Sequence, residues 1–483
     1  MNKLDLEQKV INAILLLGVL LSLIQFIYNR SLWLDEAMLA FNIIHKNSNE
    51  LLKPLDYYQV APILFLQLEK FFSILIDNSE YGLRLLLLLS FWCSLYFFYR
   101  IIRLLFTNPY TIIFGLSIFV FNHDLLYFSS EVKQYMCDVL VLTSIYYILL
   151  KPYKNVKNKY YLLGAIGSLN VFLSNVTPII LFSAGTFLLY ELLINKKINF
   201  LFIGGVILLW TITFLLYYYF FIEGHPAKDM MLNYWTNNNA FMPHNITNSD
   251  FYKFLIEKTN MVFRSHLNLG KFGVFFIPVF LFGYIALFRR YKIDIILITL
   301  IPIVLHLLLS GFKLYPFDTR LILYICPLTI IIVSFGFDCL RGLTFNYFKI
   351  KRATLLAPLI SLLFLIMFFR NPFPMENQEL KKGINYISNH LKKGDKIYVS
   401  SIGIPAMKYY NDTKFINFSA PIIFGSNNYI DDLKSLKGRN WLLFVGNNTS
   451  NEVIIQKLNS LNYNKLQLFK STGVGTLLYK FPE

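Results

Sequence analysis

Charge is scarce in this sequence. Only 15% of its 483 residues are charged, against 56% hydrophobic residues, whereas soluble proteins carry about 25% charge. Cysteine is scarce too, and the four cysteines form no C-x-x-C pair, which argues against a disulfide framework or a zinc cluster. Residues beyond 370 contain no G-x-G-x-x-G, Walker A, H-E-x-x-H or G-x-S-x-G motif. The low charge indicates a membrane protein, and the missing motifs leave its last part without an enzymatic signature of its own.

Long apolar runs occupy most of the first 370 residues. Each is close to the roughly 20 residues that an α-helix needs to span hydrocarbon. The runs are 11–28, 84–105, 110–127, 136–150, 159–174, 177–194, 199–222, 272–288, 293–310, 320–338 and 353–369. Segment 61–77 is interrupted by Gln67, Glu69 and Lys70, so whether it crosses is left open. We predict a polytopic α-helical membrane domain over residues 1–370, with about 11–13 transmembrane helices.

The net charge of +17 is distributed in a way that argues against a nucleic-acid partner. Much of the basic excess lies in short loops between apolar runs, and such loops are cytoplasmic by the positive-inside rule. These loops are 151–159, 195–198, 289–292 and 341–352. We therefore expect the first loop at 29–60, the large loop at 223–271, the loop at 311–319 and all residues beyond 370 to lie outside a plasma membrane. This arrangement requires an odd number of crossings between residues 61 and 105.

The composition changes after Arg370. Residues 376–393 have the pattern of an amphipathic helix, and short strands are predicted at 396–400, 414–418, 441–445 and 476–480. Residues 371–483 are therefore expected to form a small extracytoplasmic α/β domain, which we interpret as a lid or an acceptor-binding module.

Two adjacent acids, Asp35 and Glu36, follow closely after the first apolar run. An ionised carboxylate at a membrane surface is costly unless it has a task or a partner. We interpret this pair as the chemical centre of an integral membrane enzyme. Apolar residues at helical spacing from Trp33 to Ile44 predict an amphipathic helix in the outer interface, with Asp35 turned towards protein or water. The alternative is structural: Asp35 or Ser31 caps this helix, and Glu36 lies in its first turn.

A second polar cluster lies between residues 123 and 138. Glu131, Tyr135 and Asp138 are spaced i, i+4 and i+7, so they are predicted to share one helix face, with Asp138 about 10 Å deeper than Glu131. An ionisable residue at that depth usually faces a cavity or a partner, which makes these residues candidates for substrate binding. The alternative is a salt bridge of Glu131 with Lys133 or a distant arginine.

A third polar cluster separates two late apolar runs and contains Lys313, Tyr315, Asp318 and Arg320. Lysine supplies a point charge and arginine a bidentate fork, a combination that suits a phosphate or pyrophosphate at the outer membrane surface. The alternative is that these side chains only reach from helix ends to the interface, with an Asp318–Arg320 pair.

The Trp-x-Asp-Glu-Ala motif at 33–37 resembles GT-C glycosyltransferases, in the branch of protein O-mannosyltransferases, the lipid A aminoarabinose transferase and rhizobial galacturonosyltransferases, which is similar to glycosyltransferase family 39. Weaker motifs follow in the same order as in that branch. The segment 57–62 resembles its His-Pro-Pro-type helix opening, 81–84 its x-x-Leu-Arg helix start, 130–135 its x-Glu-x-Arg-x-Tyr segment and 313–320 its late outer loop. This chain departs from the branch at Gln59, in place of histidine or an acid, and at Lys133, in place of arginine.

The resemblance implies an inverting membrane glycosyltransferase with its active site on the outer face. Its donor would be a monosaccharide linked to polyprenyl phosphate, and its acceptor a glycolipid such as lipopolysaccharide, another cell-envelope glycan or a protein. Asp35 would be the general base, while Lys313, Arg320 and Arg84 would stabilise the departing lipid phosphate. Gln59 and Tyr315 are further substrate-binding candidates by position. Glu36, Glu131 and Asp138 would orient hydroxyl groups, or hold a divalent cation if one is used.

Two other functions compete with this hypothesis. A polymerase or ligase of lipid-linked glycans also uses outer loops with arginine and acids, but it would not need the early Trp-x-Asp-Glu-Ala motif. A transporter or flippase predicts inverted repeats and helices broken at mid-membrane, and the sequence contains no such repeat.

Overall fold

The structure is a computed structural model that describes most of the chain. The described residues are 3–77, 80–194, 200–290, 292–348, 356–416, 418–426, 429–445, 456, 458, 460 and 464–481. Contacts divide the chain into two compact units. The first, here called the helical unit, comprises residues 1–27, 60–66 and 85–373, and the second, the mixed unit, comprises residues 28–59, 67–84 and 374–483.

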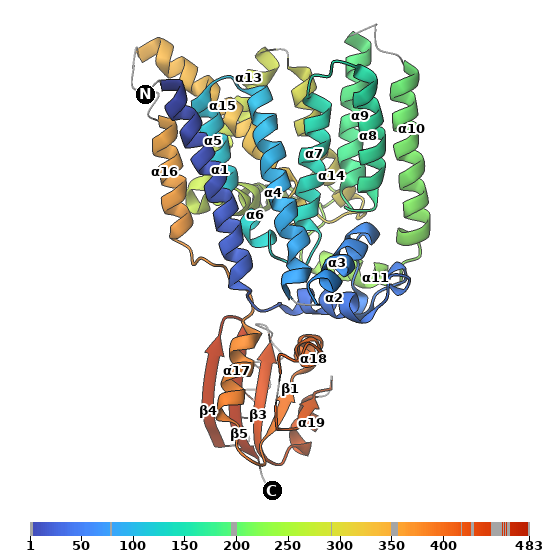
Figure 1. Ribbon diagram of the computed structural model, residues 1–483, viewed down its shortest axis with the longest axis vertical. Coiled ribbons are helices and arrows are strands. Elements are labelled where there is room, and N and C mark those ends of the chain that lie inside the picture. Colours follow the sequence, from blue (N-terminus) through green and yellow to red (C-terminus); the bar gives the residue numbers. More distant parts are fainter. Residues whose placement is uncertain are drawn as a thin grey trace. The chain divides into compact units, whose positions relative to one another are not determined.

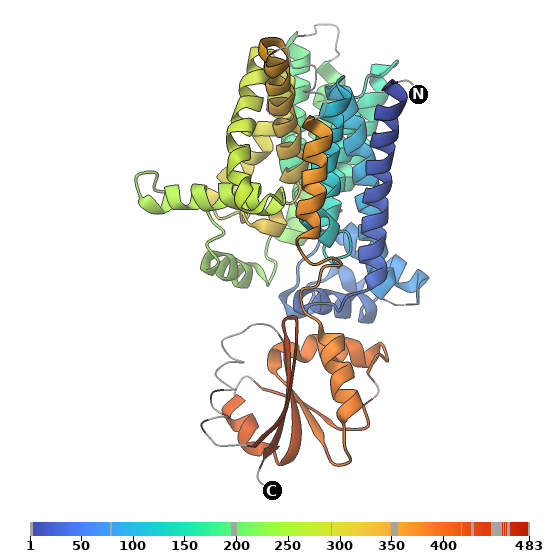
Figure 2. The ribbon, with the colours of Figure 1, turned by 90° about the vertical axis from the view of Figure 1, so that its left-hand side faces the viewer.

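Long apolar helices build the helical unit (Figure 1). The described helices are α1 (Lys3–Tyr28), α4 (Glu80–Leu105), α5 (Pro109–Val120), α6 (His123–Phe128), α7 (Tyr135–Leu150), α8 (Val156–Val171), α9 (Thr177–Ile194), α10 (Phe200–Tyr217), α11 (Lys228–Asn237), α12 (Ser249–Met261), α13 (Phe276–Arg289), α14 (Ile293–Gly311), α15 (Ile325–Phe348) and α16 (Leu356–Phe369). Most run along one direction, whereas α12 lies across them (Figure 2). Each predicted apolar run coincides with helix over much of its described length, so a polytopic helical fold is confirmed.

The run at 110–127 is two helices rather than one. The Asn122 side chain accepts a hydrogen bond from the backbone N–H of Leu125, 3.0 Å away, and so caps α6 immediately after α5 has ended. Within the described residues, seven helices are long and apolar enough to cross a membrane by length and composition: α1, α4, α9, α10 with its π-helical extension, α13 with the turn before it, α14 and α15. Helices α5 and α7 are shorter apolar helices.

Glycine permits the close approach of α13 and α15, two helices that pack tightly against each other. A Cβ atom on Gly283 would lie 2.1 Å from the carbonyl oxygen of Ile332, and one on Gly336 would lie 2.0 Å from that of Val279. Small residues at such contacts are typical of helix packing in membranes.

Two of the predicted cytoplasmic loops lie at the same end of the helical unit. The loop after α7 and the loop after α13 lie at the end of the helical unit where the N-terminus is drawn (Figure 1). The predicted basic segments Lys196–Lys197 and 349–352 lie outside the described residues. Helix α3 (Ile63–Leu75), in the segment whose crossing was left open, has 13 residues, or about 20 Å at 1.5 Å per residue. It is thus shorter than the roughly 30 Å hydrocarbon core.

The mixed unit contains the first loop and a five-stranded sheet. The loop leads into α2 (Leu34–His45) and then the short 3₁₀ turns η1 (Glu50–Leu52) and η2 (Asp56–Tyr58). The sheet has the strand order β2-β1-β3-β5-β4, from β1 (Lys396–Val399), β2 (Ile422–Phe424), β3 (Gly438–Val445), β4 (Asn464–Ser471) and β5 (Val474–Phe481). Strand β1 pairs in parallel with β2 and β3, whereas β5 is antiparallel to β3 and β4.

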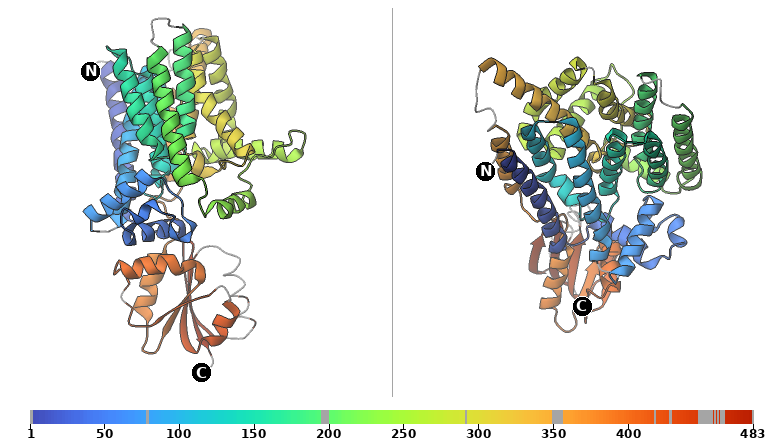
Figure 3. Two further views of the ribbon diagram at one scale, coloured as in Figure 1. Left: turned by 90° about the vertical axis from the view of Figure 1, so that its right-hand side faces the viewer. Right: turned by 45° about the horizontal axis from the view of Figure 1, so that its top comes forward.

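Helices cover both faces of this sheet. Figure 3 shows α17 (Leu380–His390) and α19 (Tyr429–Ser435) on opposite sides of it. The buried core includes Leu433, Leu442, Phe444, Leu477 and Tyr479. The predicted α/β character is therefore correct.

One predicted strand is wrong. Residues 414–416 and 418 are not a strand, and residue 417 lies outside the described part. Helix α18 (Ile404–Asp412) is capped by Thr413, and the next residue, Lys414, has a positive φ of 58°. The backbone N–H groups of Phe415 and Ile416 then donate to the carbonyl of Tyr410. The second strand begins only at Ile422, because the chain first has to close the helix.

Candidate active site

The first turn of α2 presents the two acids to different surroundings. Asp35 is partly exposed, and its Oδ1 accepts a hydrogen bond from Nε2 of Gln59 at 3.2 Å. Gln59 follows η2, so the loop after α2 returns to the start of the helix at this point. Asp35 and Gln59, two separately predicted site residues, are thus in direct side-chain contact.

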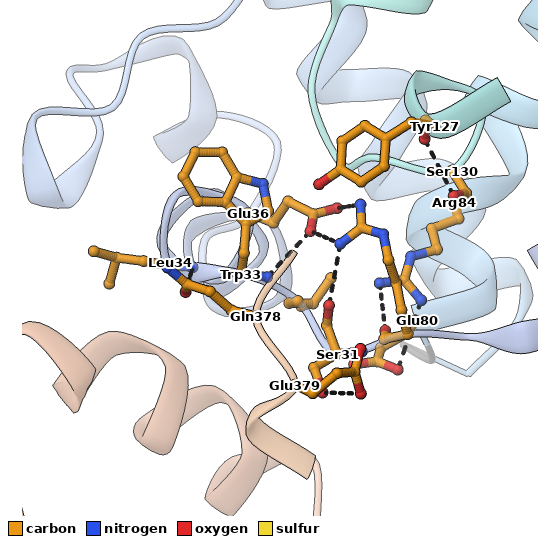
Figure 4. Close-up of polar contacts among 12 residues, drawn as sticks. Ser31, Trp33, Leu34, Glu36, Glu80, Arg84, Tyr127, Ser130, Gln378 and Glu379 are labelled. Carbon is orange, nitrogen blue, oxygen red and sulfur yellow. Dashed lines mark hydrogen bonds and ion pairs between the residues drawn. The ribbon is translucent and has the colours of Figure 1, made fainter. Parts of the chain in front are cut away.

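Glu36 is fully buried and engaged by a neighbouring arginine. Its two oxygens accept from both terminal nitrogens of Arg30, at 2.6 and 3.1 Å, and neither side chain is exposed. One oxygen also accepts from the backbone N–H of Trp33 at 3.1 Å (Figure 4). A buried bidentate pair of this kind fixes geometry strongly, because removing either partner would leave an uncompensated charge.

The helix cap differs from the structural alternative considered above. Trp33 occupies the cap position, and Glu36 is the third helical residue whose carboxylate reaches back to the Trp33 N–H. The buried face of α2 includes Glu36, Leu39, Ala40 and Ile43. Phe41 and Ile44, from the predicted apolar stripe, are partly buried, and the predicted helix is present.

Arg84 lies beneath the first loop in the mixed unit. It is fully buried, and its guanidinium donates to the carbonyl of Arg30 at 2.8 Å and to the side chain of Asn29. Glu80 lies one helical turn before it, with a carboxylate oxygen 3.9 Å from the Arg84 guanidinium. This arrangement gives Arg84 a role in holding the loop backbone.

The Glu131 cluster does not share one helix face. Helix α7 begins only at Tyr135, and Glu131 lies in the bend before it, where the Lys133 N–H donates to the Glu131 carbonyl at 2.6 Å. Asp138 lies in the first turn of α7, and its depth relative to Glu131 is therefore not set by a helical rise. All three side chains are buried. The Oδ1 atom of Asp138 has no hydrogen-bond partner among the described residues.

Arg320, from the third polar cluster, contacts Tyr135, from the second. Its guanidinium carbon lies 5.8 Å from the ring centre of Tyr135 and 5.4 Å from that of Trp235, on the large loop. Asp318 does not depend on Arg320 for its charge pairing, because its carboxylate accepts from Lys258 Nζ at 2.8 Å and caps the turn at Thr319–Ile322. Two of the predicted substrate-binding residues, Tyr135 and Arg320, are therefore neighbours.

A buried histidine anchors the loop that carries this cluster. His306 on α14 contacts the Pro316 carbonyl through Nε2 and the Tyr324 hydroxyl through Nδ1, both at 2.9 Å. The ring of Tyr315 packs 5.1 Å from the histidine ring. Lys313 is exposed, with a positive φ of 56°. The loop thus has one end fixed on His306 while Lys313 faces outward.

Several of these residues were missed from the sequence. Arg30 is a basic residue at the end of the first span that is predicted to lie outside, and a basic residue there goes against the positive-inside trend, which was a usable signal. His306 is an ionisable residue within an apolar run, which is a signal of the same kind. Glu80 was missed as well, although its i,i+4 spacing to Arg84 was a usable signal.

The acids suggested as ligands for a divalent cation do not fit that role. Glu36 has both oxygens engaged by Arg30. Across the described residues, no three His, Cys, Asp or Glu side chains gather into a group that could hold a metal ion.

Known structures identify the architecture. No protein-family model and no curated protein sequence matches this chain. The crystal structure of ArnT from Cupriavidus metallidurans bound to undecaprenyl phosphate is similar with a TM-score of 0.53 and 11% identity, over 97% of each chain. The apo state of the same protein gives 0.51 and 10%, over 96% of this chain and 97% of that one. The chain has the ArnT fold. The predicted fold class, a polytopic helical protein with a small C-terminal α/β domain, is therefore confirmed.

Proposed function

We propose that this protein is a membrane glycosyltransferase that moves a monosaccharide from a polyprenyl-phosphate donor to an acceptor hydroxyl. The observation that carries the proposal is the ArnT fold over 97% of both chains, since the similar ArnT structure is bound to undecaprenyl phosphate. The partly exposed Asp35 beside a buried, fully engaged Glu36 supports it, because one acid is accessible and the other holds its place.

Asp35 is the general base of the proposed reaction. It takes the proton of the acceptor hydroxyl, and the hydroxyl oxygen attacks the anomeric carbon of the donor. The bond between that carbon and the phosphate oxygen breaks, the lipid phosphate leaves with the bonding electrons, and the configuration inverts. A positioned base contributes about 10²–10⁴-fold to such a rate. Gln59 donates to Oδ1 of Asp35, which orients the carboxylate for this step.

Arg320 and Lys313 are proposed to bind the lipid phosphate. Negative charge accumulates on this group as it leaves, and a cation placed there lowers the barrier. The Tyr135 and Trp235 rings lie beside the Arg320 guanidinium and, being uncharged, position it without neutralising it. Glu131, Tyr135, Tyr315 and Asp138 are assigned to sugar or acceptor hydroxyls, with Asp138 contributing an oxygen that accepts no hydrogen bond from the described residues.

Glu36 and Arg84 take positioning roles instead of contacting substrate. Both side chains are buried. Glu36 accepts from the guanidinium of Arg30, and Arg84 donates to the backbone carbonyl of Arg30.

We further propose that the reaction takes place on the outer face of the plasma membrane and that its acceptor is a component of the cell envelope. In this proposal, residues 1–370 form the catalytic membrane domain and residues 371–483 form a domain outside the membrane on the same face.

The test is a comparison of wild type with Asp35→Asn in membrane vesicles. Vesicles are given undecaprenyl-phosphate-linked monosaccharides, one sugar at a time, and the undecaprenyl phosphate released is measured by mass spectrometry. We expect release with at least one sugar in wild type and a loss of about 10²–10⁴-fold in the variant. Wild-type release by folded Asp35→Asn would remove Asp35 as the base. Absence of release with every sugar, in vesicles that retain their native acceptors, would count against the donor class.

A further inference from the structure

Four consecutive backbone amides before Asp35 are each held by a side chain. The N–H groups of Ser31, Trp33 and Leu34 donate to Glu379 at 3.4 Å, Glu36 at 3.1 Å and Gln378 at 2.9 Å, in that order (Figure 4). The Leu32 N–H donates to the Tyr410 hydroxyl at 2.8 Å. Three of the four acceptors come from the C-terminal part of the chain. An extended segment that enters a helix has no regular partner for these donors, so their positions depend on the acceptors.

The Ser31 side chain is held in the same way. Its hydroxyl donates to Glu379 at 3.3 Å and accepts from the backbone N–H of Lys381 at 2.9 Å. The Lys381 ammonium in turn donates to the carbonyl of Asn29 at 2.9 Å and pairs with Glu80. The segment around Glu379 therefore contacts the loop through side chains and backbone alike.

Tyr410 links the loop to the start of α4. Its hydroxyl accepts from Leu32 and donates to Glu80 at 2.8 Å, and the side chain is 1% exposed. Burial, reinforced by the charge of Glu80, raises the pKa of Tyr410 well above its ordinary range, so the hydroxyl stays protonated and can donate. Helix α18, which carries Tyr410, also packs along α2. The His45–Asp412 contact at 3.1 Å lies at the far end of that packing.

We propose that residues 378–381 and Tyr410 are positioning residues that hold segment 29–36 in the conformation in which Asp35 acts as base. This inference rests on the proposed function. The C-terminal part of the mixed unit then serves as a fixed support of the catalytic loop, which is a different role from the lid or acceptor-binding module that its sequence suggested. A displacement of a reacting group by about 1 Å can cost about 10²-fold in rate, so loss of these contacts should lower kcat while the donor KM is kept.

Tyr410→Phe and Gln378→Leu test this proposal on the full-length protein. Each removes hydrogen bonds to the loop and little volume, and Gln378 is partly exposed, so its variant is expected to fold. The conservative Gln378→Glu keeps an acceptor for the Leu34 N–H. Tyr398→Phe is the matched control, because Tyr398 is also 1% exposed and donates to a carboxylate, Asp432, but its hydroxyl does not bond the loop.

Two measurements are compared. Hydrogen exchange of the peptide that contains residues 29–36 reports on the loop, and undecaprenyl phosphate release reports on kcat and KM. We expect exchange to accelerate by about tenfold or more in Tyr410→Phe and Gln378→Leu, with kcat lowered by about tenfold or more and KM within about twofold. Gln378→Glu and Tyr398→Phe should stay near wild type in both.

The outcomes separate this inference from the proposed function. Unchanged exchange in both loop variants would overturn the inference, whatever the activity. Faster exchange with an unchanged kcat would overturn it too, because the loop would then be held for another purpose. If Asp35→Asn were fully active while exchange still accelerated, the proposed base would fail and the contacts would remain as support of the loop alone.

Discussion

In segment 29–36 of the mixed unit, successive polar groups are hydrogen-bonded. Four consecutive backbone amides, the Ser31 hydroxyl and both oxygens of Glu36 have partners. Around Arg320 in the helical unit, the guanidinium lies over two aromatic rings, and Asp138 on a nearby element has an oxygen that lacks a hydrogen-bond partner among the described residues. A base has to be fixed before the reaction, whereas a binding region must keep groups available for a substrate. Under the proposed function, segment 29–36 holds the base and the Arg320 region binds the substrate.

The largest loss of stability should come from breaking the buried Arg30–Glu36 ion pair in segment 29–36. Arg30→Met leaves the Glu36 carboxylate buried without its partner, which should cost about 3–5 kcal/mol of stability. The measurement is the thermal unfolding midpoint of the purified protein in detergent. Lys434→Ala is the control, because the Lys434–Asp431 pair belongs to the same unit but both its side chains are mostly exposed. That variant should change stability by about 0.5 kcal/mol or less. Equal midpoints for the two variants would show that the Arg30–Glu36 pair does not hold the region.

A smaller effect is expected in the Arg320 region, and on binding. Arg320→Ala removes the cation proposed to hold the lipid phosphate, so the affinity for undecaprenyl phosphate should fall by about 10- to 100-fold. Arg320→Lys should recover part of it, because lysine keeps the charge but loses the planar fork. Native mass spectrometry with undecaprenyl phosphate alone measures this binding.

The control for that experiment is Lys253→Ala. Lys253 is an exposed lysine on α12 that pairs only loosely with Asp250, at 3.4 Å. Its loss should leave binding unchanged. If Arg320→Ala bound the lipid phosphate as tightly as wild type, or Asp35→Asn lost binding as well, the division between a fixed base and a binding cation would be wrong.

The sequence predicted the regular parts of this molecule well, because membrane helices follow from continuous apolar runs. It failed where local contacts override periodicity. Glu131 matches the helical spacing of Tyr135 and Asp138, but a tight turn at Lys133 delays the start of α7. Likewise, 414–418 has the alternation of a strand, but the end of α18 occupies it.

Long-range contacts were out of reach for a different reason. Asp35, Gln59, Tyr135 and Arg320 were each predicted as site residues, but the sequence did not indicate which of them are in contact. Nothing in the spacing of Ser31 and Glu379, which are 348 positions apart, indicates that they bond. The support of the loop depends on tertiary contacts of this kind, and only coordinates reveal it.

The smallest effect is expected at a buried, hydrogen-bonded carboxylate of the mixed unit that does not contact segment 29–36. A variant there tests whether such hydrogen bonds affect the reaction rate or only the stability of the fold. Asp395 is buried and accepts from Arg439 Nε at 2.7 Å and from Trp441 Nε1 at 3.1 Å. Burial alone would raise the pKa of Asp395, but these bonds outweigh it and hold the pKa below its ordinary value. A depressed pKa stabilises the fold above the ordinary aspartate pKa of about 4, and that stability is lost as pH falls through the lowered value.

Asp395→Asn should therefore lower the unfolding midpoint at neutral pH, and the difference from wild type should shrink as the pH is brought below about 4. Exposed Asp431→Asn is the control, and its unfolding midpoint at neutral pH should stay near that of wild type. Because Asp395 does not bond segment 29–36, its variant should keep a wild-type kcat at temperatures where it is folded. A loss of kcat as large as that of Tyr410→Phe would mean that the whole sheet, rather than the contacts to the loop, sets the position of Asp35.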